Sequence, residues 1–328
     1  MTSFLVRRLS TAVLILLILS FVIFLLQSVS PGDPARAYVG ANASNEMVAA
    51  ERQRLGLNDP MLEQFARFVG GLFTGDLGRS LRTRQPVTAD IATYLPATAE
   101  LVVAAFLIAL ALAVLYALSG ALRWPGASVG RGVLLLLATA PPFLLALVGI
   151  IVFFGQLGWL PARGVGNYQD PGPFGMQLLD TLLHGQTNAI VDALQHLVLP
   201  AVVLAIAPAV AIGRVFRSSL QGVLGVDYVR TARSKGLSET QVVVHHVVRN
   251  AIGPALSMAG LQLGFMFAGV VVVEQIFSWP GIGNYLTTAL LNADMNAVLG
   301  ATLVIGAVFI GINKVSDVLY RVIDPRAR

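Results

Sequence analysis

GVLGVDYVRTARSKGLSETQVVVHHVVRNAIGP, residues 222–254, lies between two long apolar runs and carries the signals of two helices joined by a tight turn. Asp227 is of a residue type that caps helix N-termini, and Gly236 stands directly after Lys235, where a left-handed residue would end that first helix. Ser238 and Gln241 have the spacing of a capping box, which predicts a second helix that Val242 to Val244 continue. The stretch therefore predicts a compact helix-turn-helix and not a loose linker.

Positive charge is concentrated in and around this stretch. Lys and Arg accumulate in the cytoplasmic loops of membrane proteins, so the charge predicts that the helix-turn-helix lies in the cytoplasm. Held there between two membrane spans, it would suit docking to a soluble partner. The basic residues are Arg214, Arg217, Arg230, Arg233, Lys235 and Arg249.

The composition is that of an integral membrane protein. Of the 328 residues, 56% are hydrophobic and 12% are charged, and the mean hydropathy is +0.76. A soluble domain of this size could not bury so much apolar surface. The net charge of +5 and pI near 9.9 are explained by the basic cytoplasmic loops, because no basic helix with interleaved aromatic residues indicates nucleic-acid binding.

Six apolar runs are each long enough to cross a bilayer core of roughly 30 Å. The first exceeds the apolar body of a secretory signal peptide, so we interpret it as a retained span and not as a cleaved leader. Arg163 is the only basic residue in the two short segments predicted to be external, which predicts cytoplasmic termini. The expected layout is a cytoplasmic N-terminus and first span over 1–29, an external domain over 30–96 and a membrane core over 97–328, with further spans over 97–118, 132–154, 197–216, 252–276 and 297–318.

The motifs DYVRTARSKGLS and RNAIGP together resemble the coupling segment of permease subunits of ATP-binding-cassette importers, in the dipeptide and oligopeptide branch. We therefore name residues 222–250 the coupling segment. The general permease signature has Glu-Ala-Ala, three residues, then Gly, and here Arg230, Thr231, Ala232 and Gly236 stand at those positions. The departures at the first two positions, Arg230 and Thr231, are those of the peptide branch. PGDP, RLGLNDP and GDLGRS in the external domain resemble the B-type peptide permeases as well.

This resemblance implies an all-α, six-helix permease of the type I importer kind, in a bacterial cytoplasmic membrane. It implies a heterodimer with a homologous permease subunit, two ATP-binding subunits that hold ATP and Mg²⁺, an external substrate-binding protein and a peptide substrate. The short helix would enter a cleft on an ATPase subunit, whereas an ordinary cytoplasmic connection that binds nothing is the simpler alternative. The residues expected to couple the chain to the ATPase are Asp227, Tyr228, Arg230, Thr231, Ala232, Arg233, Lys235 and Gly236.

Two places at membrane depth are candidates for the translocation path or its outer gate. Pro141 and Pro142 interrupt the backbone hydrogen-bond ladder, which predicts a kink or a broken helix of architectural or path-lining use. Glu274, with Gln275 beside it, lies near the external end of the fifth span within VVVEQIFSWPGIG, which also resembles the peptide branch. A carboxylate there either faces the path, where it would meet a substrate amine, or is a structural group that snorkels to the interface or pairs with an arginine.

Other chemistry is absent from the sequence. There is no cysteine, no GxxxxGK[ST] and no paired-histidine motif, so thiol chemistry, an ATP site of its own and a metal site are not expected. Nickel, glutathione or another small solute is the alternative cargo for the same type of system. An ion-coupled secondary transporter would need acidic or histidine relays at mid-membrane, and an intramembrane hydrolase would need a nucleophile with a base.

Overall fold

The computed structural model describes residues 2–29, 33–40, 42–166 and 172–323. Within these ranges every regular element is a helix, and the only strand-like pairing is one isolated bridge between Arg79 and Pro86. Pro31 and Gly32 of the PGDP motif lie outside the described residues, as do Arg326 and Arg328 near the C-terminus. The chain divides into two compact units, one of 1–97 with 280–307 and one of 98–279 with 308–328.

The first unit combines the N-terminal region with a later pair of helices. Its core joins Val87 and Ile91 of α5 to Ile282 and Tyr285 of α13 and to Ala301 of α14. The elements that lie wholly or partly in this unit are α1 (Thr2–Val29), α2 (Pro34–Val39), α3 (Asn45–Arg54), α4 (Met61–Thr74), the start of α5 (Val87–Ala121), α13 (Ile282–Leu291) and the start of α14 (Met295–Ile323).

Two buried carboxylates hold the loop before α5 against the later helices of this unit. The Asp294 carboxylate accepts hydrogen bonds from the Ser80 hydroxyl at 2.6 Å and the Leu81 amide at 2.7 Å. Asp90 accepts from the Tyr285 hydroxyl at 3.0 Å. Burial raises the pKa of Tyr285, so its hydroxyl stays protonated and keeps donating. Sequence reasoning did not single out Asp294, although its place directly before α14 is that of an N-cap residue.

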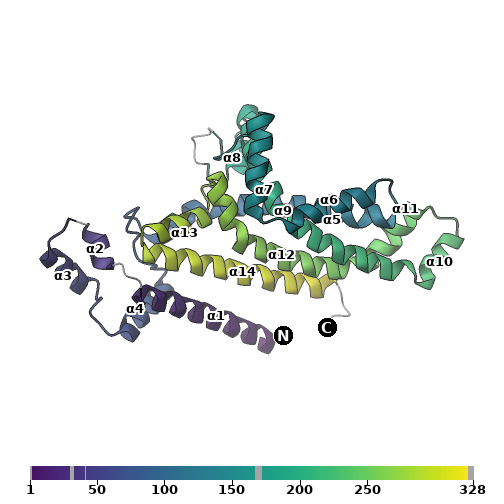
Figure 1. Cartoon of the computed structure of the whole chain (residues 1–328). Coiled ribbons are helices and arrows are strands. Elements are labelled where there is room, and N and C mark those ends of the chain that lie inside the picture. The colour runs from purple at the N-terminus through teal and green to yellow at the C-terminus, as the bar shows by residue number, and fades with distance from the viewer. Residues whose placement is uncertain (1, 30–32, 41, 167–171, 324–328) are drawn as a thin grey trace. The chain divides into compact units, whose positions relative to one another are not determined.

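The second unit is built around two long helices, α9 (Thr187–Leu224) and α12 (Val248–Phe277), which pack more extensively against each other than any other pair (Figure 1). Glycines permit close approach within it, as at Gly213, where an added Cβ would lie 3.0 Å from the Tyr116 side chain. The unit also contains α5 from Thr98 onward and the end of α14 from Val308. Its remaining elements are α6 (Ala127–Thr139), α7 (Pro142–Gly149), the π-helical η1 (Ile150–Gln156), α8 (Gln177–Leu183), α10 (Asp227–Ser234), α11 (Glu239–Gln241) and the π-helical η2 (Val242–Val247).

Among the residues that the structure describes, four helical stretches are long and apolar enough to cross a bilayer, and each overlaps one of the predicted spans. They are Val87–Ala121, Thr187–Leu224, Glu239–Phe277 and Met295–Ser316. The first three extend beyond the predicted span at both ends, because hydropathy marks only the apolar part of a helix, whereas the helix continues while its backbone groups bond internally. The apolar stretch of α1, Ser10–Leu25, is shorter, so the count of six spans stays a prediction.

The predicted interruption at the double proline is confirmed. α6 ends at Thr139 and the next helical stretch begins at Pro142, with a bend of 111° between them. Pro141 precedes the new helix in an extended conformation, and Pro142 is its first residue, where a missing N–H costs no hydrogen bond. The region is therefore a broken span or a re-entrant loop and not a smooth kink.

Candidate functional site

The coupling segment begins with α10, and its first turn differs from the prediction. Val226, in an extended conformation, is the N-cap residue, and no side chain caps the helix. Asp227 is instead the first helical residue. The expectation that Asp227 caps α10 is therefore wrong by one position. A carboxylate in the first turn still stabilises a helix through the macrodipole.

The turn after α10 is as predicted. Gly236 has φ +79°, a left-handed conformation that only residues without a Cβ adopt without strain, and its amide donates to the Arg233 carbonyl at 2.9 Å. The capping box is also present, because the Ser238 side chain accepts from the Gln241 amide while the Gln241 side chain accepts from the Ser238 amide. Both arms of the helix-turn-helix are thus fixed by local interactions.

An ion pair ties the two arms together across the glycine turn. The guanidinium of Arg233 donates to both carboxylate oxygens of Glu239, at 2.7 and 3.2 Å. The hydrogen bond to Glu239 raises the pKa of Arg233 above its ordinary value. Bidentate geometry of this kind fixes orientation as well as distance, so the pair links the two arms with the modest strength of an exposed ion pair.

One face of α10 is buried against the inner ends of the long helices. Val229 and Ala232 pack in a hydrophobic cluster with Phe216 and Leu220 of α9 and Ala251 of α12. Ala232 is only 6% exposed, so its contacts are with the long helices of its own chain. A displacement of α10 would be carried by these packed side chains into α9 and α12, because close-packed interiors deform little.

The opposite face of α10 is open. Tyr228 is 40% exposed, and the charged side chains of this face are exposed as well. Seven of the eight residues predicted to meet an ATPase therefore share an accessible surface, and Ala232 does not. The exposed residues are Asp227, Tyr228, Arg230, Thr231, Arg233, Lys235 and Gly236.

The second arm of the coupling segment does not end before the fifth span. Helical structure runs without a break through α11, η2 and α12, so that Glu239–Phe277 is one 39-residue stretch. The valines at 242, 243 and 247 in the π-helical part are fully buried. Helical structure therefore continues from the coupling segment into α12, and the start of the membrane span near Ile252 stays a prediction.

Glu274 lies near the far end of that same helical stretch. Its side chain is fully buried, and the Thr98 hydroxyl of α5 donates to its carboxylate at 2.5 Å. Burial excludes the alternative in which the carboxylate snorkels to the membrane surface. Gln275 is exposed, as are Pro141 and Pro142 at the break between α6 and α7.

Two protein-family models together match nearly the whole chain. Residues 109–328 match the family described as binding-protein-dependent transport system inner membrane component, and residues 1–102 match the N-terminal family of the same membrane components. The chain belongs to this permease family.

Similar curated proteins cover the permease from end to end. The dipeptide transport system permease protein DppB of Alkalihalophilus pseudofirmus is 36% identical, with 100% of each chain covered. The di/tripeptide transport system permease protein DppB of Pseudomonas aeruginosa is 39% identical over 100% of this chain and 99% of its own. The glutathione transport system permease protein GsiC of Salmonella paratyphi A is 35% identical over 100% of this chain and 99% of its own.

A basic cavity of about 590 Å³ lies beside the coupling segment of the permease. Arg123 and Arg217 line it together with the ion-paired Arg233 and Glu239. The C-terminal ends of two helices also line the cavity, with Gly120 and Ala121 at the end of α5 and Leu224 at the end of α9. Cations at helix C-termini offset the negative end of the macrodipole. The arginines of the cavity are therefore explained without invoking a bound ligand.

Glu100 of α5 anchors a helix that lies far along the chain. Its carboxylate accepts hydrogen bonds from the backbone amides of Gln177, Leu178 and Leu179, at 2.9, 2.6 and 3.3 Å. These amides are among the unbonded donors at the start of α8. Glu100 therefore fixes α8 to α5.

The described residues contain no cluster of metal-ligating side chains.

Proposed function

We propose that this permease imports di- or oligopeptides, paired as a heterodimer with a homologous subunit in a bacterial cytoplasmic membrane, both termini being cytoplasmic. Two ATP-binding subunits would hold ATP and Mg²⁺, and an external substrate-binding protein would deliver the peptide. The full-length similarity to dipeptide and di/tripeptide permeases supports the cargo. The glutathione permease, of nearly equal similarity, makes glutathione the second candidate, and nickel or another small solute is the more distant one.

The two-faced helix α10 is the observation that carries this proposal. Its exposed face supplies contacts for an ATPase, while Val229 and Ala232 attach it to α9 and α12. Closure of the ATP-bound ATPases would displace α10 and switch the spans from inward- to outward-facing. The nucleotide can bias this switch only through different affinities of the assembly for the two states. An ion-coupled secondary transporter would have no use for such a helix.

Cysteine crosslinking tests the contact, since the natural chain contains no cysteine. In the assembled transporter, Tyr228→Cys and Lys235→Cys are expected to crosslink to an ATPase subunit, and the yield is expected to change when ATP is added. Leu183→Cys, at a residue 61% exposed on α8 in the segment predicted to be external, is the matched control and should give no such product. A crosslink at Leu183 with none at Tyr228 or Lys235 would invert the topology and refute the proposal.

The buried carboxylate of Glu274 gives a second test, which concerns the path. If it assists passage of the peptide amine, Glu274→Gln lowers dipeptide uptake by about tenfold or more, because hydrogen bonds to charged groups contribute ~1.5–3 kcal/mol. Thr98→Val is the control, since it removes the hydroxyl donor and keeps the carboxylate. Uptake of cationic, neutral and anionic dipeptides and of glutathione should be compared, with docking of the binding protein measured separately. Unchanged kinetics across all of these cargoes would leave Glu274 a purely structural role.

A further inference from the structure

Helix α4 (Met61–Thr74) of the first unit is apolar over nearly half its circumference, yet none of its residues is fully buried. Leu62, Ala66, Val69 and Phe73 fall within about 60° of one another around the helix axis, at 3.6 residues per turn. Leu62 is 72% exposed and Phe73 is 85% exposed. We name these four residues the α4 stripe. An exposed phenylalanine and leucine on one contiguous stripe indicate an apolar partner.

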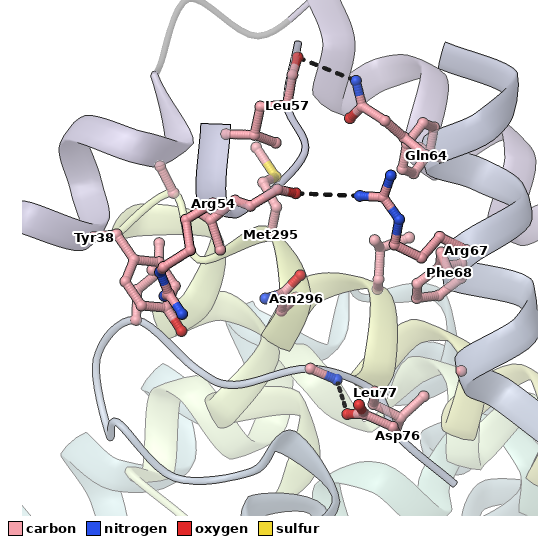
Figure 2. Close-up of a pocket in the computed structure, with 17 residues that line it drawn as sticks. Tyr38, Arg54, Leu57, Gln64, Arg67, Phe68, Asp76, Leu77, Met295 and Asn296 are labelled. Carbon is pink, nitrogen blue, oxygen red and sulfur yellow. Dashed lines mark hydrogen bonds between the residues drawn. The ribbon is translucent and has the colours of Figure 1, made fainter. Parts of the chain in front are cut away.

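The opposite side of α4 lines a cavity whose walls are partly polar and partly apolar. Gln64, Arg67, Phe68 and Gly71 line a cavity of about 420 Å³ in the first unit. Figure 2 shows Gln64 and Arg67 reaching across it to backbone carbonyls of the loop after α3, where Leu55 and Leu57 accept their hydrogen bonds. Arg67 also pairs with Asp59. One side of α4 is thus polar and the other apolar, as in helices that lie in the plane of a membrane surface.

A third side of α4 packs against α1, and this contact sets the position of α4 along the axis of α1. The ring of Phe65 packs edge-on against Phe21 and Phe24, with centroids 5.1 and 5.7 Å apart. The apolar run of α1 ends at Leu26, before Gln27 and Ser28. At 1.5 Å per residue, Phe65 therefore sits roughly 3 to 8 Å below the end of that run. This is the depth at which interfacial helices bury their apolar faces, about 5–10 Å.

At the same depth α1 itself presents apolar side chains outward. Val22, next to Phe21, is 45% exposed, and Ile18, one turn below, is 55% exposed. In a helix that spans the membrane, such side chains face lipid. Both α1 at this depth and the α4 stripe thus present exposed apolar side chains.

We propose that α4 lies in the outer membrane–water interface, with the α4 stripe in contact with the acyl chains of the outer leaflet. The external domain would then be held both by packing among its own helices and by contact of the α4 stripe with lipid. This rests on the proposed topology, in which α1 spans the membrane and residues 30–96 are external. Lipid is favoured over a protein partner because the contact of Phe65 with α1 places α4 at the depth of the interface, where α1 also exposes apolar side chains.

Spin labels on single cysteines test this in the assembled transporter, reconstituted in phospholipid nanodiscs. Leu62→Cys and Phe73→Cys report the stripe, Val22→Cys reports the lipid-facing side of α1, and Glu63→Cys reports the polar side of α4. Collision rates with oxygen, which concentrates in lipid, and with a water-soluble nickel chelate are measured for each. We expect oxygen to dominate at Leu62, Phe73 and Val22, and the nickel chelate to dominate at Glu63. ATP-driven uptake by each labelled variant, measured separately in proteoliposomes, confirms that it is assembled.

Three outcomes would overturn the inference. Dominance of the nickel chelate at Leu62 and Phe73, with lipid values at Val22, would place α4 in water and leave the permease function intact. Protection of Leu62 and Phe73 from both reagents would show that a protein covers the stripe. Dominance of the nickel chelate at Val22 would overturn the proposed topology together with the inference.

Discussion

Replacing Gly236 with valine is expected to uncouple ATP hydrolysis from transport while the chain still inserts and assembles. Gly236 has φ +79°, and an L-residue in that conformation costs roughly 1–2 kcal/mol, with β-branched residues the worst placed. A cost of that size changes the population of the native turn roughly 5- to 30-fold. Because the turn sets α10 against α11, ATP-driven uptake should fall by a similar factor. The ratio of substrate transported to ATP hydrolysed in proteoliposomes measures it.

The expected defect comes from backbone strain and not from lack of space. No atom lies within 4 Å of where a Cβ on Gly236 would sit, so a side chain there meets nothing. Gly225→Val is the matched control, since Gly225 ends α9 with φ −88° and is equally open. Gly236→Asn should retain most of the uptake, because asparagine tolerates the left-handed region. If Gly236→Val were coupled as tightly as Gly225→Val, the turn would not be needed for coupling.

Gly260→Leu is expected to destabilise the second unit by about 1–3 kcal/mol, the usual cost of overpacking. A Cβ on Gly260 would lie 2.3 Å from both the Cβ and the Oγ of Ser316, on the neighbouring α14. One turn further, a Cβ on Gly264 would lie 3.1 Å from the Asn313 side chain and 3.2 Å from Phe309. Small residues four apart allow membrane helices to approach closely, and a leucine would force them apart. Denaturant titration in detergent micelles measures the loss.

A control on the same helix separates the effect of the close contact with α14 from a general sensitivity of α12 to larger side chains. Gly269, also on α12, has no atom near the position of its Cβ, so Gly269→Leu should leave stability within about 0.5 kcal/mol of the natural chain. Compensation provides a further check, because Ser316→Gly removes the atoms that an alanine at Gly260 would meet. The pair Gly260→Ala with Ser316→Gly should therefore be more stable than Gly260→Ala alone. Equal losses for Gly260→Leu and Gly269→Leu would refute the close contact between α12 and α14.

Much of the coupling segment could be predicted from its sequence because its signals are local. The left-handed Gly236, the capping box of Ser238 and Gln241, and the helix break at Pro141 and Pro142 each depend on residues within one or two turns. The exception is Asp227, where the helix begins one residue earlier than its capping preference suggests. Several residue types compete for the N-cap position, so propensity fixes a helix start only to within a residue or two.

The sequence by itself determined that this is a helical membrane protein, where its apolar helices lie, and the turn geometry of the segment between α9 and α12. Only the tertiary structure decided what the buried polar groups do. Thr98 donates to Glu274, 176 positions away, and Glu100 holds the start of α8, 77 positions away. It also decided that Ala232 faces inward while its neighbours remain exposed. The physical reason is range: caps and turns form between neighbours along the chain, whereas the partner of a buried carboxylate depends on how distant helices pack.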